Sequence, residues 1–149
     1  MSLVFAAITP HPPLLIPSIG KDALIKVEKT KKALEKLEED LYLTSPDVIL
    51  IISPHGGFFK DAFTIHHAVE YETDFREFGD LATRVKFHGE TNLTYQIREA
   101  TKSMSLPATM ISEKIIDHGA SVPLIYLTAH LPNVTVVPIG FCDLDWKTH

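Results

Sequence analysis

The sequence predicts an α/β protein with a central, mostly parallel sheet flanked by helices. Residues 3–8 and 48–52 form two continuously apolar runs, which are typical of strands covered on both faces of a parallel sheet. The segment between them is charged and carries apolar residues at helical spacing. A strand, a helix and a strand joined by short connections form a βαβ unit, so the two strands should run parallel to each other.

Composition limits the classes of protein that remain. The chain has 149 residues, which is enough for a single α/β domain spanning residues 1–149. Its balance of apolar and charged residues is that of a soluble globular protein, and no apolar stretch is long enough to span a bilayer. The N-terminus lacks a basic leader and the single cysteine fits a reducing compartment, so we expect a cytoplasmic protein. A net charge of -5 argues against a nucleic-acid partner.

The remaining elements follow from periodicity and turn residues. A helix should begin near Lys21 and end near Leu43, with one apolar stripe formed by Leu24, Val27, Leu34, Leu37 and Leu41. Further strands are predicted at residues 62–68, 81–87, 108–111 and 134–139, and further helices at 91–103 and 121–130. In the last helix we expect Ser121 to be the N-cap and Pro123 to lie in the first turn.

Each of the two apolar runs ends in a loop that presents a histidine. The first loop is Thr9-Pro10-His11-Pro12-Pro13 and the second is Ser53-Pro54-His55-Gly56-Gly57. Prolines fix the backbone around both imidazoles, and ligands of α/β sheets gather where parallel strands end. His11 and His55 are therefore candidates for one shared metal site. The alternative is that each is an ordinary polar residue of a surface loop.

His118, His66 and His67 are further candidates for a functional site. His118 precedes the last predicted helix, where the positive end of the helix dipole favours a neutral imidazole that can act as a base, and Gly119 leaves room for a substrate. A histidine that merely begins a loop is the alternative. His66 and His67 are adjacent in a predicted strand, so their side chains should point to opposite faces and at most one can join a given site.

Three blocks together resemble the class III extradiol ring-cleavage dioxygenases. They are Ile8-Thr9-Pro10-His11-Pro12-Pro13-Leu14-Leu15, Ile52-Ser53-Pro54-His55-Gly56, and Asp117-His118-Gly119 with Val122-Pro123-Leu124. The group includes the catalytic subunit of protocatechuate 4,5-dioxygenase, DOPA-dioxygenase-like enzymes and Memo-like proteins. The resemblance implies an α/β fold that holds a non-haem Fe(II), or sometimes Zn(II), on two histidines and a carboxylate.

By the same resemblance, His11 and His55 are the two metal ligands and His118 is the second-sphere acid/base. The implied partners are a small aromatic diol and dioxygen. Family members are longer and take their carboxylate ligand from a C-terminal half, so we expect this chain to be the N-terminal part of a longer dioxygenase-like domain. Nearby carboxylates that could substitute are Asp117, Asp143 and Glu90.

Three functions follow as hypotheses. The first is extradiol cleavage of a catechol-like ring with Fe(II) and dioxygen. The second is a non-catalytic, Memo-like module that binds a metal or a partner, and the third is a Zn(II) hydrolase whose activity is indifferent to oxygen. An exposed final strand would also allow a homo-oligomer, and Phe58, Phe59 and Phe63 are candidates for an aromatic pocket.

Overall fold

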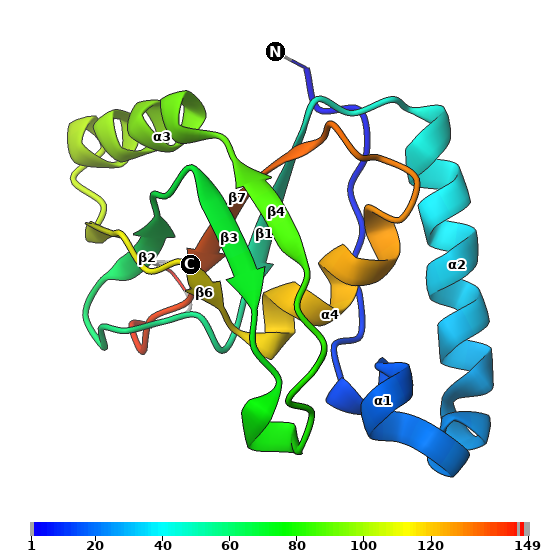
Figure 1. Ribbon diagram of the computed structural model, residues 1–149. Coiled ribbons are helices and arrows are strands. Elements are labelled where there is room, and N and C mark those ends of the chain that lie inside the picture. Colours follow the sequence, from blue (N-terminus) through cyan, green and yellow to red (C-terminus); the bar gives the residue numbers. More distant parts are fainter. Residues whose placement is uncertain (1, 146, 148–149) are drawn as a thin grey trace.

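The computed structural model describes residues 2–145 and 147, and it shows a curled sheet with helices packed against it (Figure 1). The sheet has seven strands in the order β5-β2-β7-β4-β3-β6, with β1 paired to β7 outside this path. The strands are β1 (Val48–Ser53), β2 (Phe63–His66), β3 (Glu70–Thr73), β4 (Lys86–Gly89), β5 (Ala108–Ile111), β6 (Ile115–Ile116) and β7 (Thr135–Gly140). The predicted α/β class is confirmed.

Strand β7 lies at the centre of the sheet. It pairs in parallel with β1 along its whole length, while its other edge pairs first with β4 and then with β2. Pro138 lies between these two partners, at a position where that edge makes no bridge, so its missing N–H costs little in a central strand. Among the strand pairs of the described residues, only β2–β7 and β3–β4 are antiparallel, so the sheet is mostly parallel as predicted.

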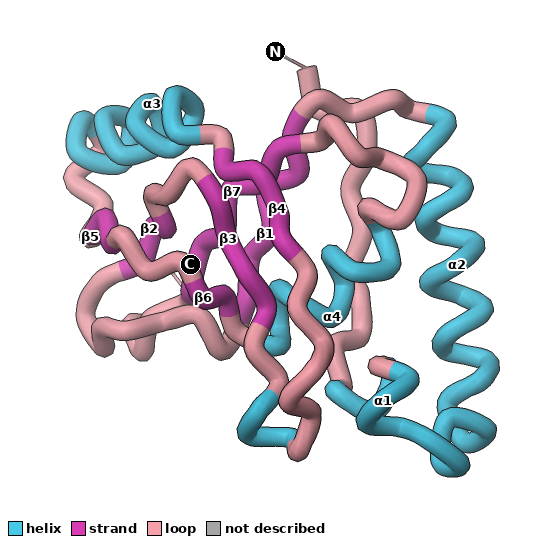
Figure 2. The backbone as a smooth tube through the Cα atoms, in the orientation of Figure 1, coloured by secondary structure: helices cyan, strands magenta, loops and turns pink. Residues whose placement is uncertain are grey.

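Helices cover the sheet on two sides (Figure 2). They are α1 (Pro17–Gly20), α2 (Glu28–Leu43), α3 (Thr91–Ser103) and α4 (His118–Leu127), with 3-10 turns η1 (Pro13–Leu15), η2 (Lys21–Val27) and η3 (Arg76–Phe78). Helix α4 packs against β1, and α2 packs on the outside of α4. Helix α3 packs against β2, β5 and β7. Within the described part of the chain, no helix is both long and apolar enough to cross a membrane.

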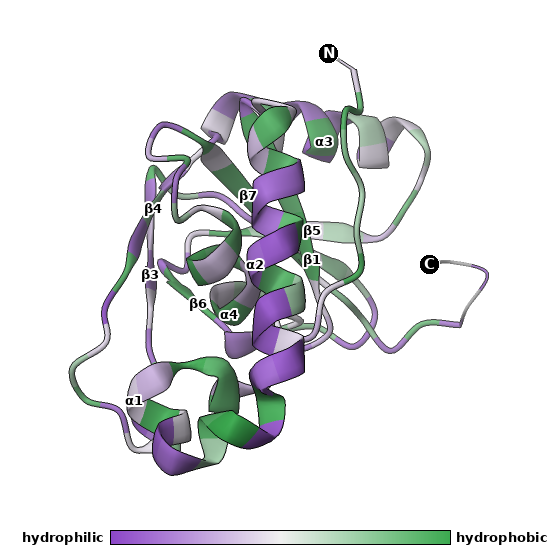
Figure 3. Cartoon of the chain, turned by 90° about the vertical axis from the view of Figure 1, so that its right-hand side faces the viewer, coloured by the Kyte–Doolittle hydropathy of each residue, from purple (hydrophilic) through white to green (hydrophobic). Residues whose placement is uncertain are grey.

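The apolar stripe predicted for the first long helix is confirmed for the part that is α-helical. Leu34 and Leu41 are buried, and Leu37 packs against the core that contains Leu34, Leu15 and Phe75. The outward face is charged, with ion pairs one turn apart such as Glu28–Lys32 (Figure 3). The α-helix begins later than predicted, because residues 21–27 form the 3-10 turn η2.

Residues 3–8 do not form the predicted strand. No regular secondary structure occurs in residues 2–12, and Leu3 and Ile8 are almost fully exposed. A strand requires a hydrogen-bonding neighbour, and none of the described strands pairs with this segment. The predicted βαβ unit is therefore wrong. Strand β1 forms as predicted, but Leu50 and Ile52 are exposed, so it is covered on one face rather than two.

The remaining predictions differ mainly at element ends. Helix α3 and strand β5 have the predicted bounds, and β2 is shorter than predicted. Strand β4 is displaced towards the C-terminus and shares only residues 86–87 with the predicted strand. Helix α4 begins at His118 with Asp117 as its N-cap, so Ser121 is not the cap and Pro123 lies inside the helix. The Asp117 carboxylate accepts a hydrogen bond from the Gly119 N–H. The Ser121 hydroxyl instead donates to the carbonyl of Ile116, five residues earlier in the chain.

Candidate metal centre

Three histidines from separate parts of the chain meet beyond the end of β1. His11 Nε2 and His55 Nε2 are 3.1 Å apart, and the His55 and His118 rings are stacked with centroids 4.4 Å apart. Each of the three offers one ring nitrogen to a group whose members lie within 4.8 Å of one another. The predicted convergence of His11 and His55 is thus present in the structure, although His11 does not follow a strand.

The loop that carries His11 is fixed from its C-terminal side. The turn η1 closes it through a hydrogen bond from the Leu15 N–H to the Pro12 carbonyl. The Tyr126 hydroxyl of α4 donates to the Leu15 carbonyl at 2.6 Å, and the Leu15 side chain is fully buried. These contacts connect the first histidine to the helix that begins with the third.

His55 and His118 are joined through one carboxylate. The backbone N–H of His55 donates to Ser53 Oγ, and the Ser53 hydroxyl donates to Asp117 Oδ1 at 2.5 Å. The same oxygen accepts the Gly119 N–H at 2.7 Å. Asp117 therefore holds the end of β1 and the beginning of α4 in a fixed relation.

This close approach requires glycine at two positions. A Cβ at Gly119 would collide with Ser53 Oγ, and a Cβ at Gly140, the last residue of β7, would collide with the Gly56 carbonyl. Glycine lets the loop after β1, the end of β7 and the first turn of α4 pack directly on one another.

The His118 ring is partly enclosed by the loop between β3 and β4. Phe78 packs edge-on against it with centroids 5.0 Å apart, and Glu77 Oε1 lies 3.8 Å from His118 Nδ1. Burial and then the neighbouring His55 lower the pKa of His118, while Asp117 and Glu77 act in the opposite direction. The net direction agrees with the neutral imidazole that was predicted, but burial is its main cause.

The three imidazoles fit a transition metal. Two nitrogens bound at about 2.1 Å to one ion, at a right angle, would lie about 3.0 Å apart, which is close to the His11–His55 separation. Imidazole is a ligand for iron, zinc and copper alike, so the donor set does not select one metal. Among the described residues, no carboxylate belongs to this tight group.

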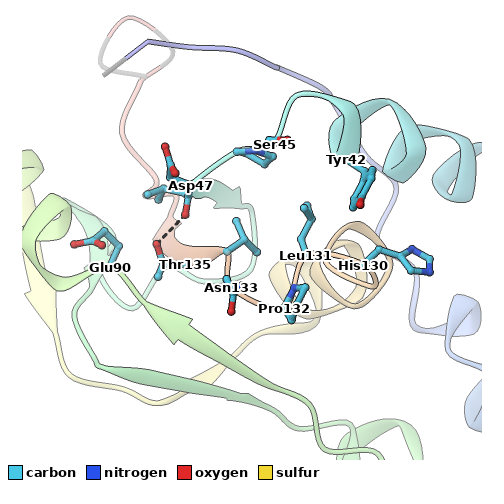
Figure 4. Close-up of a pocket in the computed structure, with 12 residues that line it drawn as sticks. Tyr42, Ser45, Asp47, Glu90, His130, Leu131, Pro132, Asn133 and Thr135 are labelled. Atoms are coloured by element: carbon cyan, nitrogen blue, oxygen red, sulfur yellow. Dashed lines mark hydrogen bonds between the residues drawn. The ribbon is translucent and has the colours of Figure 1, made fainter.

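The carboxylates considered as substitutes lie in different places. Asp117 Oδ1 is engaged by Ser53 and Gly119, and the Asp143 N–H donates to the Lys60 carbonyl. Glu90 caps α3 through the Asn92 N–H and lines a hollow of about 470 Å³ at the opposite end of the sheet (Figure 4). Position alone therefore excludes Glu90 from the histidine group.

His66 and His67 were singled out in the sequence, and they differ in the structure. His66 is 2% exposed and lies near Asp117 and Gly56, whereas His67 is half-buried. Sequence reasoning missed Ser53 and Glu77, because nothing local marks residues that meet a histidine only after folding. The Phe58 ring lies near His66, with the two ring centroids 6.1 Å apart.

A second hollow, of about 440 Å³, borders the loop after β1. Its lining comprises Pro54, Gly57, Phe58, Phe59, Lys60, Phe141, Cys142 and Asp143. Two of the three phenylalanines expected near an aromatic pocket, Phe58 and Phe59, thus line a hollow beside His55, and Phe63 does not.

Comparison with known proteins gives two matches. The family model described as the catalytic LigB subunit of aromatic ring-opening dioxygenase matches residues 5–145. The protein CA_C1420 of Clostridium acetobutylicum is 28% identical over 154 residues, which is 97% of this chain and 33% of the relative. The chain therefore spans about a third of the length of that relative.

Proposed function

Because the chain belongs to the family of the catalytic LigB subunit of aromatic ring-opening dioxygenases, we propose that it takes part in extradiol cleavage of a catechol-like ring at a metal held by His11 and His55. The observation that carries the proposal is the convergence of three imidazoles at the end of β1. A bound Fe(II) would supply open positions for a diol and for dioxygen. The resemblance implies Fe(II) as the metal, and Zn(II) is the alternative.

The protein's own residues have distinct tasks in this proposal. His11 and His55 bind the metal, and the Ser53–Asp117 link keeps His55 in place. His118, neutral because its pKa is lowered, takes a proton from the second hydroxyl of the diol and returns it during ring opening. Phe78 packs against the His118 ring and gives the site an apolar border, which suits an aromatic ring.

The main test separates ligands from the acid/base. His11→Ala and His55→Ala should abolish binding of Fe(II) in anaerobic titration. His118→Ala should retain the metal but lose turnover of catechols, which is measured as oxygen uptake. Retention of metal by both of the first two variants would contradict the proposed site.

A non-catalytic metal-binding module is the second candidate. It is favoured by the absence of a carboxylate from the histidine group among the described residues, and by the position of His118, whose nitrogen lies with the other two. In that case His118→Ala should also lose metal, and no catechol should perturb the spectrum of the Fe(II)-loaded protein. A Zn(II) hydrolase would instead show activity that does not depend on oxygen.

A further inference from the structure

His66 is a buried histidine that the proposed mechanism does not use. It is the last residue of β2 and is 2% exposed, and its Nδ1 has no hydrogen-bond partner among the described residues. A buried polar atom without a partner destabilises the folded state. Such an atom inside a packed sheet therefore requires an explanation.

The register of the sheet turns His66 towards the histidine group. Thr64 is paired with Gly140 of β7, and side chains two residues apart on a strand share a face, so His66 lies on the same face as Gly140. Gly140 packs directly on the loop after His55. His67 directly follows β2, and because adjacent side chains of an extended chain alternate between faces, we expect it on the other face.

Gly56 marks the place where His66 meets the site. A Cβ at Gly56 would lie 2.8 Å from Asp117 Oδ2 and 3.7 Å from His66 Nε2. Ser53 and Gly119 both hydrogen-bond to Asp117 Oδ1. The other carboxylate oxygen, Oδ2, and His66 Nε2 therefore both lie beside Gly56, in the loop after β1.

The ring nitrogens of His66 have different surroundings. Burial lowers the pKa of His66, so its ring is neutral and carries a single N–H. The backbone of Gly56 and of Glu113, and the charges of Asp117 and Glu113, act on the pKa in the opposite direction. Of the two ring nitrogens, Nε2 is the one that lies beside Gly56.

We propose that His66 is a positioning residue of the metal centre, which acts through Asp117 and the Gly56 loop on His55 and on the beginning of α4. The proposal rests on metal binding by His11 and His55, as argued above. It assigns to His66 a role outside the metal's own ligands. Groups that orient metal ligands typically change metal affinity by about 10- to 100-fold when they are removed.

Three substitutions at position 66 and one at position 67 test it, with Co(II) as a spectroscopic probe. His66→Leu removes both nitrogens, His66→Asn keeps a polar group where Nδ1 lies, and His66→Gln keeps an N–H where Nε2 lies. His67→Leu is the matched control, because His67 Nδ1 is also buried without a partner among the described residues. Visible absorption reports the Co(II) affinity and geometry, and thermal unfolding reports stability.

We expect His66→Leu and His66→Asn to lose about 10-fold in Co(II) affinity, with a changed spectrum, and His66→Gln to recover most of it. His67→Leu should bind Co(II) like the wild type. The Tm of His66→Leu should be no lower than that of His67→Leu, because an unpartnered buried atom has been removed. A purely structural role would lower Tm and affinity together.

A double substitution tests the route through Asp117. In an Asp117→Asn background, His66→Leu should add little to the loss of Co(II) affinity. Wild-type Co(II) affinity in His66→Leu, equal behaviour of the Asn and Gln variants, or additive losses would overturn the role of His66 alone. Failure of the wild-type protein to bind Co(II) would overturn the metal centre itself, and this proposal with it.

Discussion

His118 is surrounded by groups that act on its charge in opposite directions. Burial and the two other imidazoles favour the neutral ring, while the carboxylates of Asp117 and Glu77 favour the protonated one. The net effect lowers the pKa of His118 below its ordinary value of about 6.5. The base form should therefore persist to a lower pH than it does in a free histidine.

Glu77→Gln should extend that range further. Removing a charge that raises the pKa of His118 lowers this pKa again, so the acid limb of the kcat/KM profile for ring opening should move to lower pH. The measurement is the pH dependence of oxygen uptake with a catechol. Glu99→Gln, on the half-exposed face of α3, is the control. An acid limb that stays in place in Glu77→Gln would show that this carboxylate does not act on His118.

At the scale of single residues, local motifs could be recognised in the sequence, whereas contacts between residues far apart in the chain could not. His11 and His55 could be predicted because proline and glycine around each imidazole are visible in a few residues. The Ser53–Asp117 hydrogen bond joins residues 64 positions apart, so no local pattern marks it. Glu77 looks like any other surface glutamate until η3 places it beside His118.

At the scale of single elements, Asp117 has two separable tasks. It caps α4 through the Gly119 N–H, and it carries the negative charge that faces Ser53. Asparagine is as good an N-cap as aspartate but is uncharged. Asp117→Asn should therefore keep the helix cap. The unfolding free energy of Asp117→Ala should be lower than that of Asp117→Asn by about 0.5–2 kcal/mol, the cost of a missing cap.

Urea unfolding of the two Asp117 variants measures this difference, and Co(II) titration measures the other task. Both variants should bind the metal more weakly than the wild type, because neither holds Ser53 through a charge-assisted hydrogen bond. Equal stability of Asp117→Asn and Asp117→Ala would contradict the role of this side chain as the cap of α4.

Elements with strong internal signals could be predicted, and those that depend on a partner could not. Helix α3 matches its prediction because its apolar period lies within the segment and its capping glutamate directly precedes it. Residues 3–8 are as apolar as a buried strand, yet apolarity does not provide the neighbouring strand that pairing requires. The beginning of α4 was misplaced because two capping residues lie close together and the carboxylate prevails.

At the scale of the whole molecule, Asp80 connects two distant segments. Its carboxylate accepts the Ser18 hydroxyl of α1 and the N–H groups of Ala82 and Thr83, which precede β4. The hydrogen bonds from Ser18 and then Thr83 hold the pKa of Asp80 well below its usual value. A depressed pKa means that this contribution to stability is present above the unfolded-state pKa of about 3.9 and is lost as the pH falls below it.

Acid unfolding should therefore depend on this residue. We expect the unfolding free energy of the wild type to fall below about pH 4, and Asp80→Asn to be less stable at pH 7 but to show a shallower fall. Urea unfolding at a series of pH values measures both. Asp61→Asn, on an exposed loop, should follow the wild-type curve. Parallel curves for Asp80→Asn and the wild type would remove Asp80 from the account of acid stability.

The outer edge of β1 is the last consequence of the sheet's arrangement. Strand β1 pairs with β7 on one side, no described strand pairs with its other edge, and its six residues carry no charge. Leu50 and Ile52 are about half exposed on one face of it. Edge strands of this kind pair readily with another chain unless a charged residue prevents it.

We expect concentration-dependent association in light scattering, and Ile52→Lys should suppress it. Leu43→Lys, an equally drastic change on an exposed residue at the end of α2, should leave association unchanged. If both lysine variants behave alike, association does not proceed through β1.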